Sequence, residues 1–249
     1  RSRGSGGCTD QRVGGKYRNS VAAENRLIRP AVSNVDQALV VMAVRTPDPQ
    51  FYLLDQYLVT MELQEIPAAI LFTKEDLDRG ELADYRSRYE TAGYPVFSVS
   101  AENGSGLEAL RAYLAGKTTV LAGPSGVGKS TLTNLLCPTA NMETGELSRK
   151  NLRGKQTTRH TELFCLGENS YLLDTPGFTA VEVWGDTEAF KQAFPEIRAL
   201  EGQCRFTGCN HRAEPDCAVK AAVARGEIAA SRYESYRKMA EESAERRKY

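Results

Sequence analysis

A phosphate-loop pattern lies in the middle of this 249-residue chain. Residues 123–130 read Gly-Pro-Ser-Gly-Val-Gly-Lys-Ser, which fits Gly-x4-Gly-Lys-Ser/Thr, and they stand between an apolar run and a helical stretch. In that context, backbone N–H groups, a helix N-terminus, a lysine and a hydroxyl converge on phosphates and Mg²⁺. The alternative is a plain glycine-rich turn, which the full pattern disfavours. The positions expected to hold nucleotide are Gly123, Pro124, Ser125, Gly126, Val127, Gly128, Lys129, Ser130 and Thr131.

An acidic motif follows the phosphate loop. Asp174 ends an apolar strand and opens Asp-Thr-Pro-Gly, about forty-five residues after Lys129. We expect Asp174 to anchor Mg²⁺ and Gly177 to offer its N–H to the terminal phosphate. Alone, Asp-x-x-Gly is a common turn, but paired with the phosphate loop it indicates a nucleotide site.

A candidate guanine-binding motif, Thr73-Lys74-Glu75-Asp76, comes about fifty residues before the phosphate loop. The carboxylate of Asp76 can accept hydrogen bonds from both N1–H and the exocyclic amine of guanine, which adenine cannot offer. Thr73 stands where asparagine is usual, so we expect it to lose an amide that braces the phosphate loop. Ser100 and Ala101, after the next strand, form a second turn expected to contact the base.

In an ordinary GTPase the phosphate loop precedes the base motif, whereas in this chain it follows the base motif. Base motif, base turn, phosphate loop and acidic motif follow one another, each at the end of an apolar strand. A nucleotide site needs its loops adjacent in space, not in sequence, so a circular permutation preserves the pocket. Strands alternate with helices, as in a doubly wound α/β domain whose ligand lies beyond the carboxyl ends of the strands.

The apolar patterns predict the following elements. Strands are expected at 37–44, 68–72, 96–100, 118–122, 162–166 and 171–173, and helices at 51–63, 77–91, up to 114, 129–136 and 228–247. We expect residues 1–30, rich in Gly, Arg and Ser, to be a linker or the remnant of a domain, 31–187 a G domain, and 188–249 a helical zinc-binding domain.

Charge and composition limit the classes of protein to which this chain can belong. Basic and acidic residues number 32 each, so the overall charge gives no case for nucleic acid. The chain lacks a long apolar span and an evident leader, so we expect a cytoplasmic protein with no membrane and no DNA partner.

The segment from about 139 to 160 is polar, basic and aperiodic, which predicts a long mobile loop. It should supply the threonine that completes Mg²⁺ coordination, either Thr157 or Thr158, with a slight preference for Thr158. The position after Asp-x-x-Gly that often holds a catalytic glutamine is Phe178. We therefore expect slow intrinsic hydrolysis, accelerated by a partner that orders this loop. Gln156 and His160 are candidate replacements, with surface roles equally open.

Cys204, Cys209, His211 and Cys217 lie within fourteen residues. Three thiolates and one imidazole form a closed tetrahedral set that suits one structural Zn²⁺ and leaves no open position for catalysis. Disulfides are the weaker alternative in a cytoplasmic chain.

The C-terminal tail mixes aromatic and basic residues. Two interpretations stay open: stacking on and pairing with RNA, or packing of the aromatic side chains on the zinc cluster with solvated charges. The residues concerned are Tyr233, Tyr236, Met239, Arg232, Arg237, Lys238, Arg246, Arg247 and Lys248.

The motif order, the spacing of the zinc ligands and the sequence of residues 27–37 closely resemble those of the bacterial circularly permuted GTPases that act in small ribosomal subunit maturation. The resemblance covers roughly residues 26–240. It implies a G domain between an N-terminal oligonucleotide-binding barrel and a zinc domain, GTP/GDP and Mg²⁺ as ligands, hydrolysis stimulated by the small (30S) subunit, and binding to its rRNA. We also expect a monomer.

Two features of the chain differ from the pattern of this family. The segment before residue 30 is too short for a five-stranded barrel, so we expect a truncated or missing barrel, whether absent from the protein or only from this sequence. Gln156 replaces the histidine usual in the Gly-Lys/Arg-His-Thr-Thr motif, a proposed catalytic group. Two rival functions remain: a P-loop ATPase or kinase, and a zinc-stabilised RNA-binding module with a structural nucleotide. Because the acidic motif directly precedes the zinc module, we expect nucleotide state to act on it through a short tether.

Overall fold

The computed structural model describes residues 35–138, 140, 162–174, 183 and 185–246. Its centre is a six-stranded sheet with the order β3-β2-β1-β4-β6-β5. All neighbours pair in parallel except β5, which runs antiparallel to β6 at the edge. The strands are β1 (Gln37–Ala43), β2 (Ala68–Thr73), β3 (Val96–Val99), β4 (Thr118–Ala122), β5 (Glu162–Gly167) and β6 (Ser170–Asp174). The prediction of a doubly wound α/β domain is confirmed.

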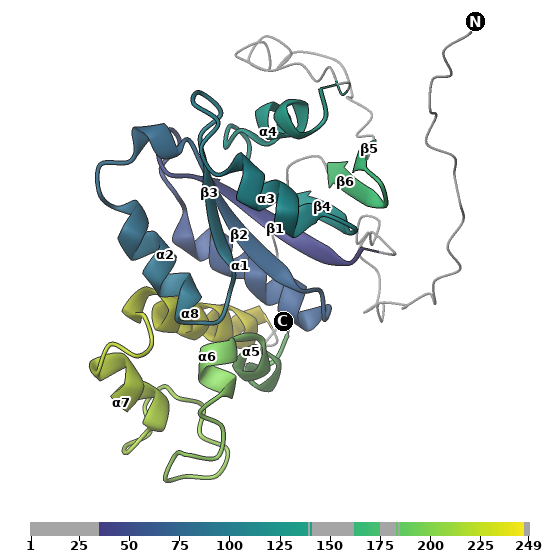
Figure 1. Cartoon of the computed structure of the whole chain (residues 1–249). Coiled ribbons are helices and arrows are strands. Elements are labelled where there is room, and N and C mark those ends of the chain that lie inside the picture. The colour runs from purple at the N-terminus through teal and green to yellow at the C-terminus, as the bar shows by residue number, and fades with distance from the viewer. Residues whose placement is uncertain (1–34, 139, 141–161, 175–182, 184, 247–249) are drawn as a thin grey trace, which may run out of the picture.

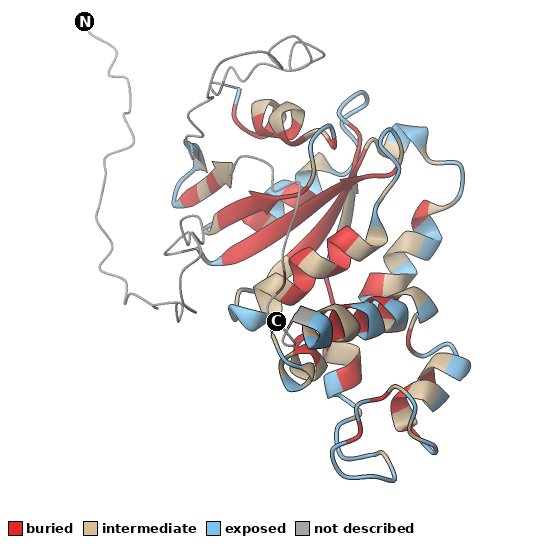
Figure 2. Ribbon diagram, turned by 180° about the vertical axis from the view of Figure 1, so that it is seen from behind, coloured by how far each residue is buried: buried red, intermediate tan, exposed pale blue. Residues whose placement is uncertain are grey.

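The central strands are buried on both faces, which explains their uninterrupted apolar sequences. Every residue of β1 is buried, and β1 pairs with β2 from Ala38↔Ala68 to Ala43↔Thr73. Figure 2 shows the burial of these strands between the helical layers.

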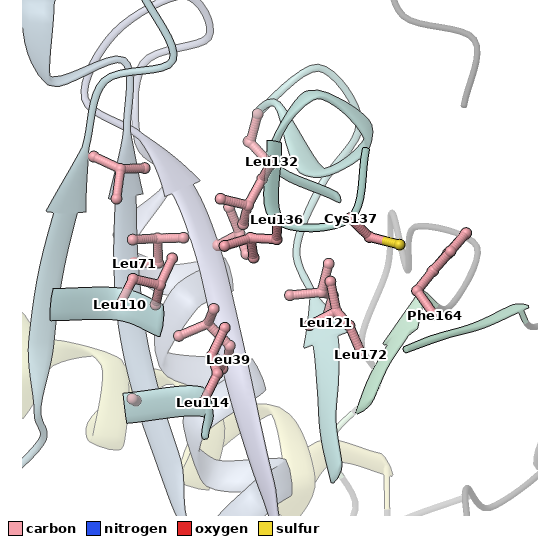
Figure 3. Close-up of a cluster of buried hydrophobic side chains, with 14 of the residues drawn as sticks. Leu39, Leu71, Leu110, Leu114, Leu121, Leu132, Leu136, Cys137, Phe164 and Leu172 are labelled. Carbon is pink, nitrogen blue, oxygen red and sulfur yellow. The ribbon is translucent and has the colours of Figure 1, made fainter. Parts of the chain in front are cut away.

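Alternate side chains of β1, β2, β3 and β4 enter two hydrophobic clusters, one on each face of the sheet. On one face α3 (Leu107–Leu114) and α4 (Lys129–Leu136) pack against the sheet through Leu110, Leu132 and neighbouring side chains (Figure 3). On the other face lie α1 (Phe51–Leu63) and α2 (Leu82–Glu90). The helices predicted at 51–63 and 129–136 are confirmed to the residue.

The single helix predicted over 77–91 is wrong at its start. A short 3-10 helix, η1 (Glu75–Leu77), follows the base motif, and α2 begins only at Leu82. The carboxylate of Asp78 accepts hydrogen bonds from the N–H groups of Gly80, Glu81 and Leu82, and Gly80 has φ +106°. A side chain that caps its own downstream backbone forms a turn and interrupts the helix.

The C-terminal region packs on the sheet domain through α1 (Figure 1). Its helices are α5 (Thr187–Ala193), α6 (Pro195–Arg198), α7 (Ala218–Ala224) and α8 (Ala230–Arg246). They share a third hydrophobic cluster that includes Val183 and also Val59 of α1. One face of α1 therefore covers the sheet, and another face receives the C-terminal region.

The chain leaves β1 toward β2 and β3 on one side and returns as β4 on the other side. The loops after β1 and β4 therefore diverge at a topological switch point, where α/β domains bind ligands. Among the described residues, no helix has both the length and the apolar composition needed to cross a lipid bilayer.

Candidate nucleotide site and metal centre

The phosphate loop joins β4 to α4 at the switch point. Gly123 has φ +146°, and a Cβ at this position would lie 2.3 Å from the carbonyl oxygen of Val41 on the neighbouring strand. Only glycine allows this approach between two backbones. Gly128, with φ +95°, precedes the first turn of α4. The N-terminus of α4 thus points its N–H groups into the loop, as phosphate binding requires.

Lys129 lies in this loop with its ammonium group turned toward backbone carbonyls. Its Nζ donates to the carbonyl oxygens of Gly123 at 2.8 Å and Pro124 at 2.7 Å. Burial lowers the pKa of Lys129, and the negative charge of Asp174 opposes that shift. The ammonium is therefore held at the loop where the outer phosphates of a nucleotide would lie.

Asp174, the last residue of β6, pairs with Leu121 next to the phosphate loop. Its Oδ1 atom is buried and has no hydrogen-bond partner among the described residues. Burial raises the pKa of Asp174, while Lys129 acts to lower it. A buried carboxylate oxygen beside a phosphate loop fits Mg²⁺, which prefers oxygen ligands and a few carboxylates. When bound, Mg²⁺ would neutralise phosphate charge, and Ser130 would add its hydroxyl.

The base motif follows β2, on the other side of β1 from the phosphate loop. Lys74 has a left-handed backbone, φ +57°, and its Nζ donates to the carbonyl oxygens of Gly126, at 3.1 Å, and of Thr46. Burial lowers the pKa of Lys74, and Asp76 opposes that shift. The stem of Lys74 thus crosses from the base motif to the phosphate loop.

Thr73 lacks the amide that usually braces the phosphate loop, as expected, but its hydroxyl makes a contact of its own with that loop. The Thr73 hydroxyl donates a hydrogen bond to the carbonyl oxygen of Val127. Thr73 is 5% exposed, and Gly128 lies beside its side chain. Threonine is shorter than asparagine, but its hydroxyl reaches the phosphate loop because β2 and the loop after β4 approach closely across β1.

The second base turn contacts the base motif directly. Ser100 Oγ donates to Asp76 Oδ1 at 2.5 Å, and Ser105 Oγ donates to Glu75 Oε2 at 2.8 Å. Ala101, beside Ser100, is exposed, as is Asp76. The structure therefore brings the base motif, the base turn and the phosphate loop together at the carboxyl edge of the sheet.

Several predicted site residues lie outside the part of the chain that the structure describes. They are Gln156, Thr157, Thr158 and His160 of the basic loop, and Gly177 with its neighbour Phe178. Their roles stay predictions.

The four predicted zinc ligands gather in one cluster. Their ligand atoms all lie within 4.8 Å of one another, and all four side chains are at least partly buried. Cys204 Sγ lies 3.9 Å from Cys217 Sγ and 3.5 Å from His211 Nδ1. A zinc tetrahedron with bonds of about 2.3 Å to sulfur has sulfur–sulfur edges of about 3.8 Å, so this set fits structural Zn²⁺.

The surroundings of the cluster shift the pKa values of its ligands in different directions: burial raises the pKa of Cys209, whereas hydrogen bonds outweigh burial and lower the pKa of Cys204. Burial lowers the pKa of His211, and the positive charge of Lys191 lowers it further. The neutral imidazole, which is the form that binds metal, is therefore favoured. The N–H of Ala218 donates to Cys204 Sγ at 3.4 Å, and the N–H of His211 donates to Cys209 Sγ at 3.4 Å. Such outer hydrogen bonds stabilise thiolates and orient metal ligands.

The aromatic side chains of the C-terminal tail pack on the zinc cluster. Tyr233 Oη donates to the His211 carbonyl oxygen at 2.6 Å, and Tyr236 Oη donates to that of Asn210 at 2.8 Å. Tyr236 and Met239 are buried. For these side chains, the packing interpretation is confirmed.

Arg232 corrects the list of tail residues that could pair with RNA. It is 1% exposed and forms ion pairs with Asp55 of α1 and Glu196 of α6. Arg237 and Lys238 are exposed, so they remain accessible on α8.

The loop of residues 45–50, between β1 and α1, also lies at this site, and no sequence motif predicted it. Its Thr46 carbonyl accepts from Lys74, and the Cδ of Pro47 lies 3.8 Å from where a Cβ at Gly126 would stand. Two prolines directly after a buried strand were the available signal, but the strand order was needed to place that loop between the base motif and the phosphate loop.

Comparisons with known proteins agree with this geometry. Residues 20–184 match the model of the RsgA GTPase family. The chain is 45% identical over 237 residues to the small ribosomal subunit biogenesis GTPase RsgA of Agathobacter rectalis, covering 94% of this chain and 78% of that protein. A similarly named protein of Alkaliphilus metalliredigens is also 45% identical, over 91% of this chain and 78% of its own length.

Two solved structures share the fold. One is YloQ, a circularly permuted GTPase, with a TM-score of 0.71 and 35% identity over 90% of this chain and 73% of that one. The other is YjeQ from Thermotoga maritima, with a TM-score of 0.70 and 39% identity over 91% and 78%. The permuted order of motifs, their assembly at one sheet edge and these similarities lead to one conclusion: the chain belongs to the RsgA GTPase family and is a GTP hydrolase.

Proposed function

We propose that this GTPase binds the small (30S) ribosomal subunit through its rRNA, acts late in the maturation of that subunit, and hydrolyses GTP faster when the subunit is bound. The observation that carries the proposal is the assembly of a guanine motif and a phosphate loop at one sheet edge, with a Cys3His cluster in the region packed beside it. The names of the relatives, which refer to small-subunit biogenesis, support the choice of partner.

The proposed nucleotide contacts follow from the site. Lys74 and Asp76 hold guanine with Ser100 and Ala101, and the loop from Gly123 to Thr131 holds the phosphates. Ser130 and Asp174 hold Mg²⁺, whose coordination is completed by Thr158 or its neighbour Thr157. Gly177 donates its N–H to the terminal phosphate. Attack by water would depend on Gln156 or His160, because Phe178 carries no group that could orient water.

The proposed arrangement of the chain keeps the boundaries expected from sequence. Residues 31–187 form the G domain, 188–249 the zinc-binding domain, and 1–30 belong to an N-terminal barrel domain or its linker. We propose a cytoplasmic monomer, with no DNA and no membrane among its partners.

The deciding experiment measures phosphate release from GTP with and without purified small subunits. We expect slow turnover of the protein alone and a large increase with small subunits, because a partner must order the group that orients water. Large ribosomal subunits are the matched control for added RNA, and Lys129→Ala is the control for contaminating GTPases. A partner-free rate equal to the stimulated rate would refute the proposal.

The same experiment separates the two rival functions. A zinc-stabilised RNA-binding module with a structural nucleotide would bind small subunits without any turnover above the Lys129→Ala control. A P-loop ATPase or kinase would hydrolyse or transfer phosphate from ATP as readily as from GTP, and the contacts of Lys74 and Asp76 argue against it.

A further inference from the structure

Helix α1 stands between the nucleotide site and the C-terminal region. It starts at Phe51, immediately after the loop of residues 45–50, which follows the central strand β1. One side of α1 packs on the sheet through Leu54 and Leu58, while Val59 belongs to the cluster of the C-terminal helices. A movement of α1 would therefore displace contacts both near the nucleotide site and in the C-terminal region.

At the nucleotide end, the loop 45–50 contacts the base motif and lies beside the phosphate loop. Lys74 Nζ donates to the carbonyl oxygen of Thr46 and to that of Gly126. Thr46 has φ +51°, an unfavourable backbone conformation for a β-branched residue. Such strain persists only where the surroundings hold the residue in place, and it is concentrated at functional sites. The strained conformation at Thr46 accompanies a carbonyl that holds the lysine of the base motif.

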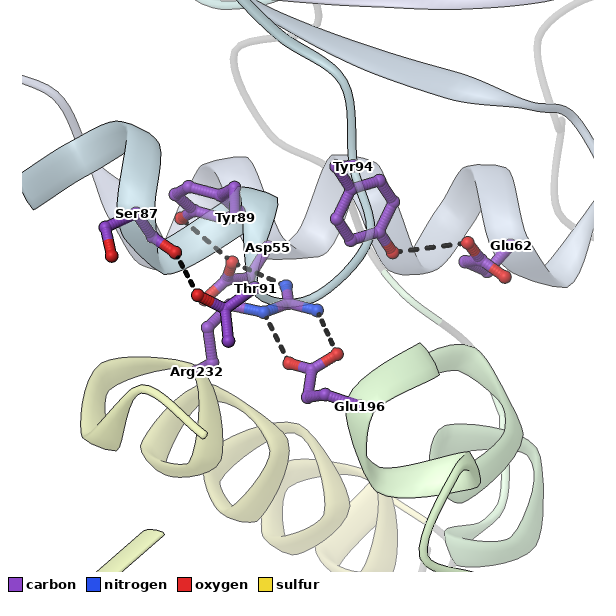
Figure 4. Close-up of polar contacts among 8 residues, drawn as sticks. All are labelled: Asp55, Glu62, Ser87, Tyr89, Thr91, Tyr94, Glu196 and Arg232. Carbon is purple, nitrogen blue, oxygen red and sulfur yellow. Dashed lines mark hydrogen bonds and ion pairs between the residues drawn. The ribbon is translucent and has the colours of Figure 1, made fainter. Parts of the chain in front are cut away.

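On the side of α1 that faces the C-terminal region, a buried ion cluster links the first turns of this helix to α6 and α8 (Figure 4). Arg232 Nη1 donates to Asp55 Oδ1 at 2.8 Å, and the same guanidinium donates to both carboxylate oxygens of Glu196, at 2.7 and 3.1 Å. The guanidinium carbon lies 4.6 Å from the ring centroid of Phe194. Tyr89 Oη adds a donor to Asp55 at 3.1 Å.

The cluster fixes a narrow set of positions for the start of α1. Asp55 lies only four residues after Phe51, so the ion cluster holds α1 close to its start and to the loop 45–50. Tyr52 Oη also donates to Glu242 of α8 at 2.8 Å. Buried charged hydrogen bonds tolerate little displacement, because a misplaced partner leaves a buried charge unpaired.

We propose that the loop 45–50 and the start of α1 form a coupling element, through which Arg232 helps position Lys74 and the phosphate loop and so tunes the release of guanine nucleotide. Energetic coupling of this kind is carried by packed side chains and hydrogen bonds. It is reciprocal, so a partner that shifts α8 would change nucleotide affinity, and nucleotide would change the affinity for that partner. The route differs from the tether expected from sequence, whose residues 175–182 lie outside the described part of the chain.

The proposal rests on guanine-nucleotide binding and not on stimulation by the ribosome. Its test is the dissociation rate of a fluorescent GDP analogue from the full chain, measured without subunits and without hydrolysis. Failure of small subunits to stimulate turnover would overturn the proposed partner and leave this measurement unaffected.

The first variant replaces the buried charges together, as Asp55→Leu, Glu196→Leu and Arg232→Met, so that no charge is left unpaired. We expect nucleotide release to accelerate by about 2- to 30-fold, the range typical of mutations along a coupled network. The matched control is Arg225→Met with Glu227→Leu, an exposed ion pair in the same region, which should leave the rate unchanged.

The second variant is Thr46→Gly, which relieves the backbone strain and loosens the loop 45–50. In combination with the triple variant, we expect an effect smaller than the product of the separate effects, because both act on one element. Multiplicative effects, or an unchanged rate in a folded triple variant, would overturn the proposal. If the triple variant does not fold, Tyr52→Phe tests the same helix at its surface, and an unchanged rate there overturns the proposal as well.

Discussion

Ser100 Oγ donates a hydrogen bond of 2.5 Å to Asp76 Oδ1, and so joins the two turns proposed to bind the base. Asp76 is exposed, so its orientation depends on the few groups that contact it. The N–H of Glu102 donates to Ser100 Oγ at 3.2 Å, which fixes the serine in turn. We expect this hydrogen bond to orient the carboxylate of Asp76 for guanine, in addition to any contact that Ser100 itself makes with the base.

Ser100→Ala is expected to weaken GDP binding by about 10- to 160-fold, because a hydrogen bond to a charged group contributes about 1.5–3 kcal/mol. Calorimetric titration with GDP measures the change. Ser105→Ala is the matched control, since Ser105 contacts Glu75 instead of Asp76. Equal affinities for the Ser100 variant and the wild-type protein would contradict the prediction.

Asp76→Asn is expected to reduce affinity for GDP by about 100-fold or more and to raise affinity for xanthosine diphosphate. The carboxylate accepts two donors of guanine, whereas an amide matches a base with an oxygen in place of the exocyclic amine. Competition between the two nucleotides for the same protein measures the preference. Retention of the GDP preference would show that Asp76 does not read the base, and it would revive the ATPase or kinase alternative.

Cys209→Ser is expected to lower zinc content from about one ion per chain to about none, since structural sites use all four ligands. Loss of zinc should expose the amides around residues 204–217 and α7 to hydrogen exchange, while β1 and β2 remain protected, because their core does not include the cluster. Metal analysis and hydrogen exchange measure both effects. The control is Cys165→Ser, an exposed thiol on β5, which should retain zinc. Full zinc content in the Cys209 variant would remove this cysteine from the ligand set.

Gly123→Ala is expected to lower GTP turnover by about 100-fold, because the new Cβ would lie 2.3 Å from Val41 and displace the phosphate loop. Turnover and GDP affinity should fall together. The matched control is Gly116→Ala, at φ +71° with open space around it. That variant should lose about 1–2 kcal/mol of stability through backbone strain alone, and it should keep its turnover. Similar turnover in the two variants would mean that the steric contact with Val41 has no functional consequence.

The sequence predicted those parts of the site that depend on local pattern. The phosphate loop, the guanine motif and the four metal ligands each occupy a short segment whose spacing is set by chemistry. The buried strands were equally visible, because a parallel strand covered on both faces is apolar along its whole length. The order of these motifs also indicated the permutation, since each motif follows an apolar strand.

Other features depended on which elements meet in space. Arg232 has the sequence context of an exposed helix residue, and it is buried only because α1 and α6 bring Asp55 and Glu196 to it. The brace from Thr73 to Val127 likewise required the approach of two loops across β1. The sequence by itself indicated the chemistry of each proposed ligand motif, because each motif lies within a short segment. Only the tertiary structure decided how the base motif meets the phosphate loop and how the C-terminal helices pack on α1, because burial and pairing of charges are properties of packed elements and not of any one segment.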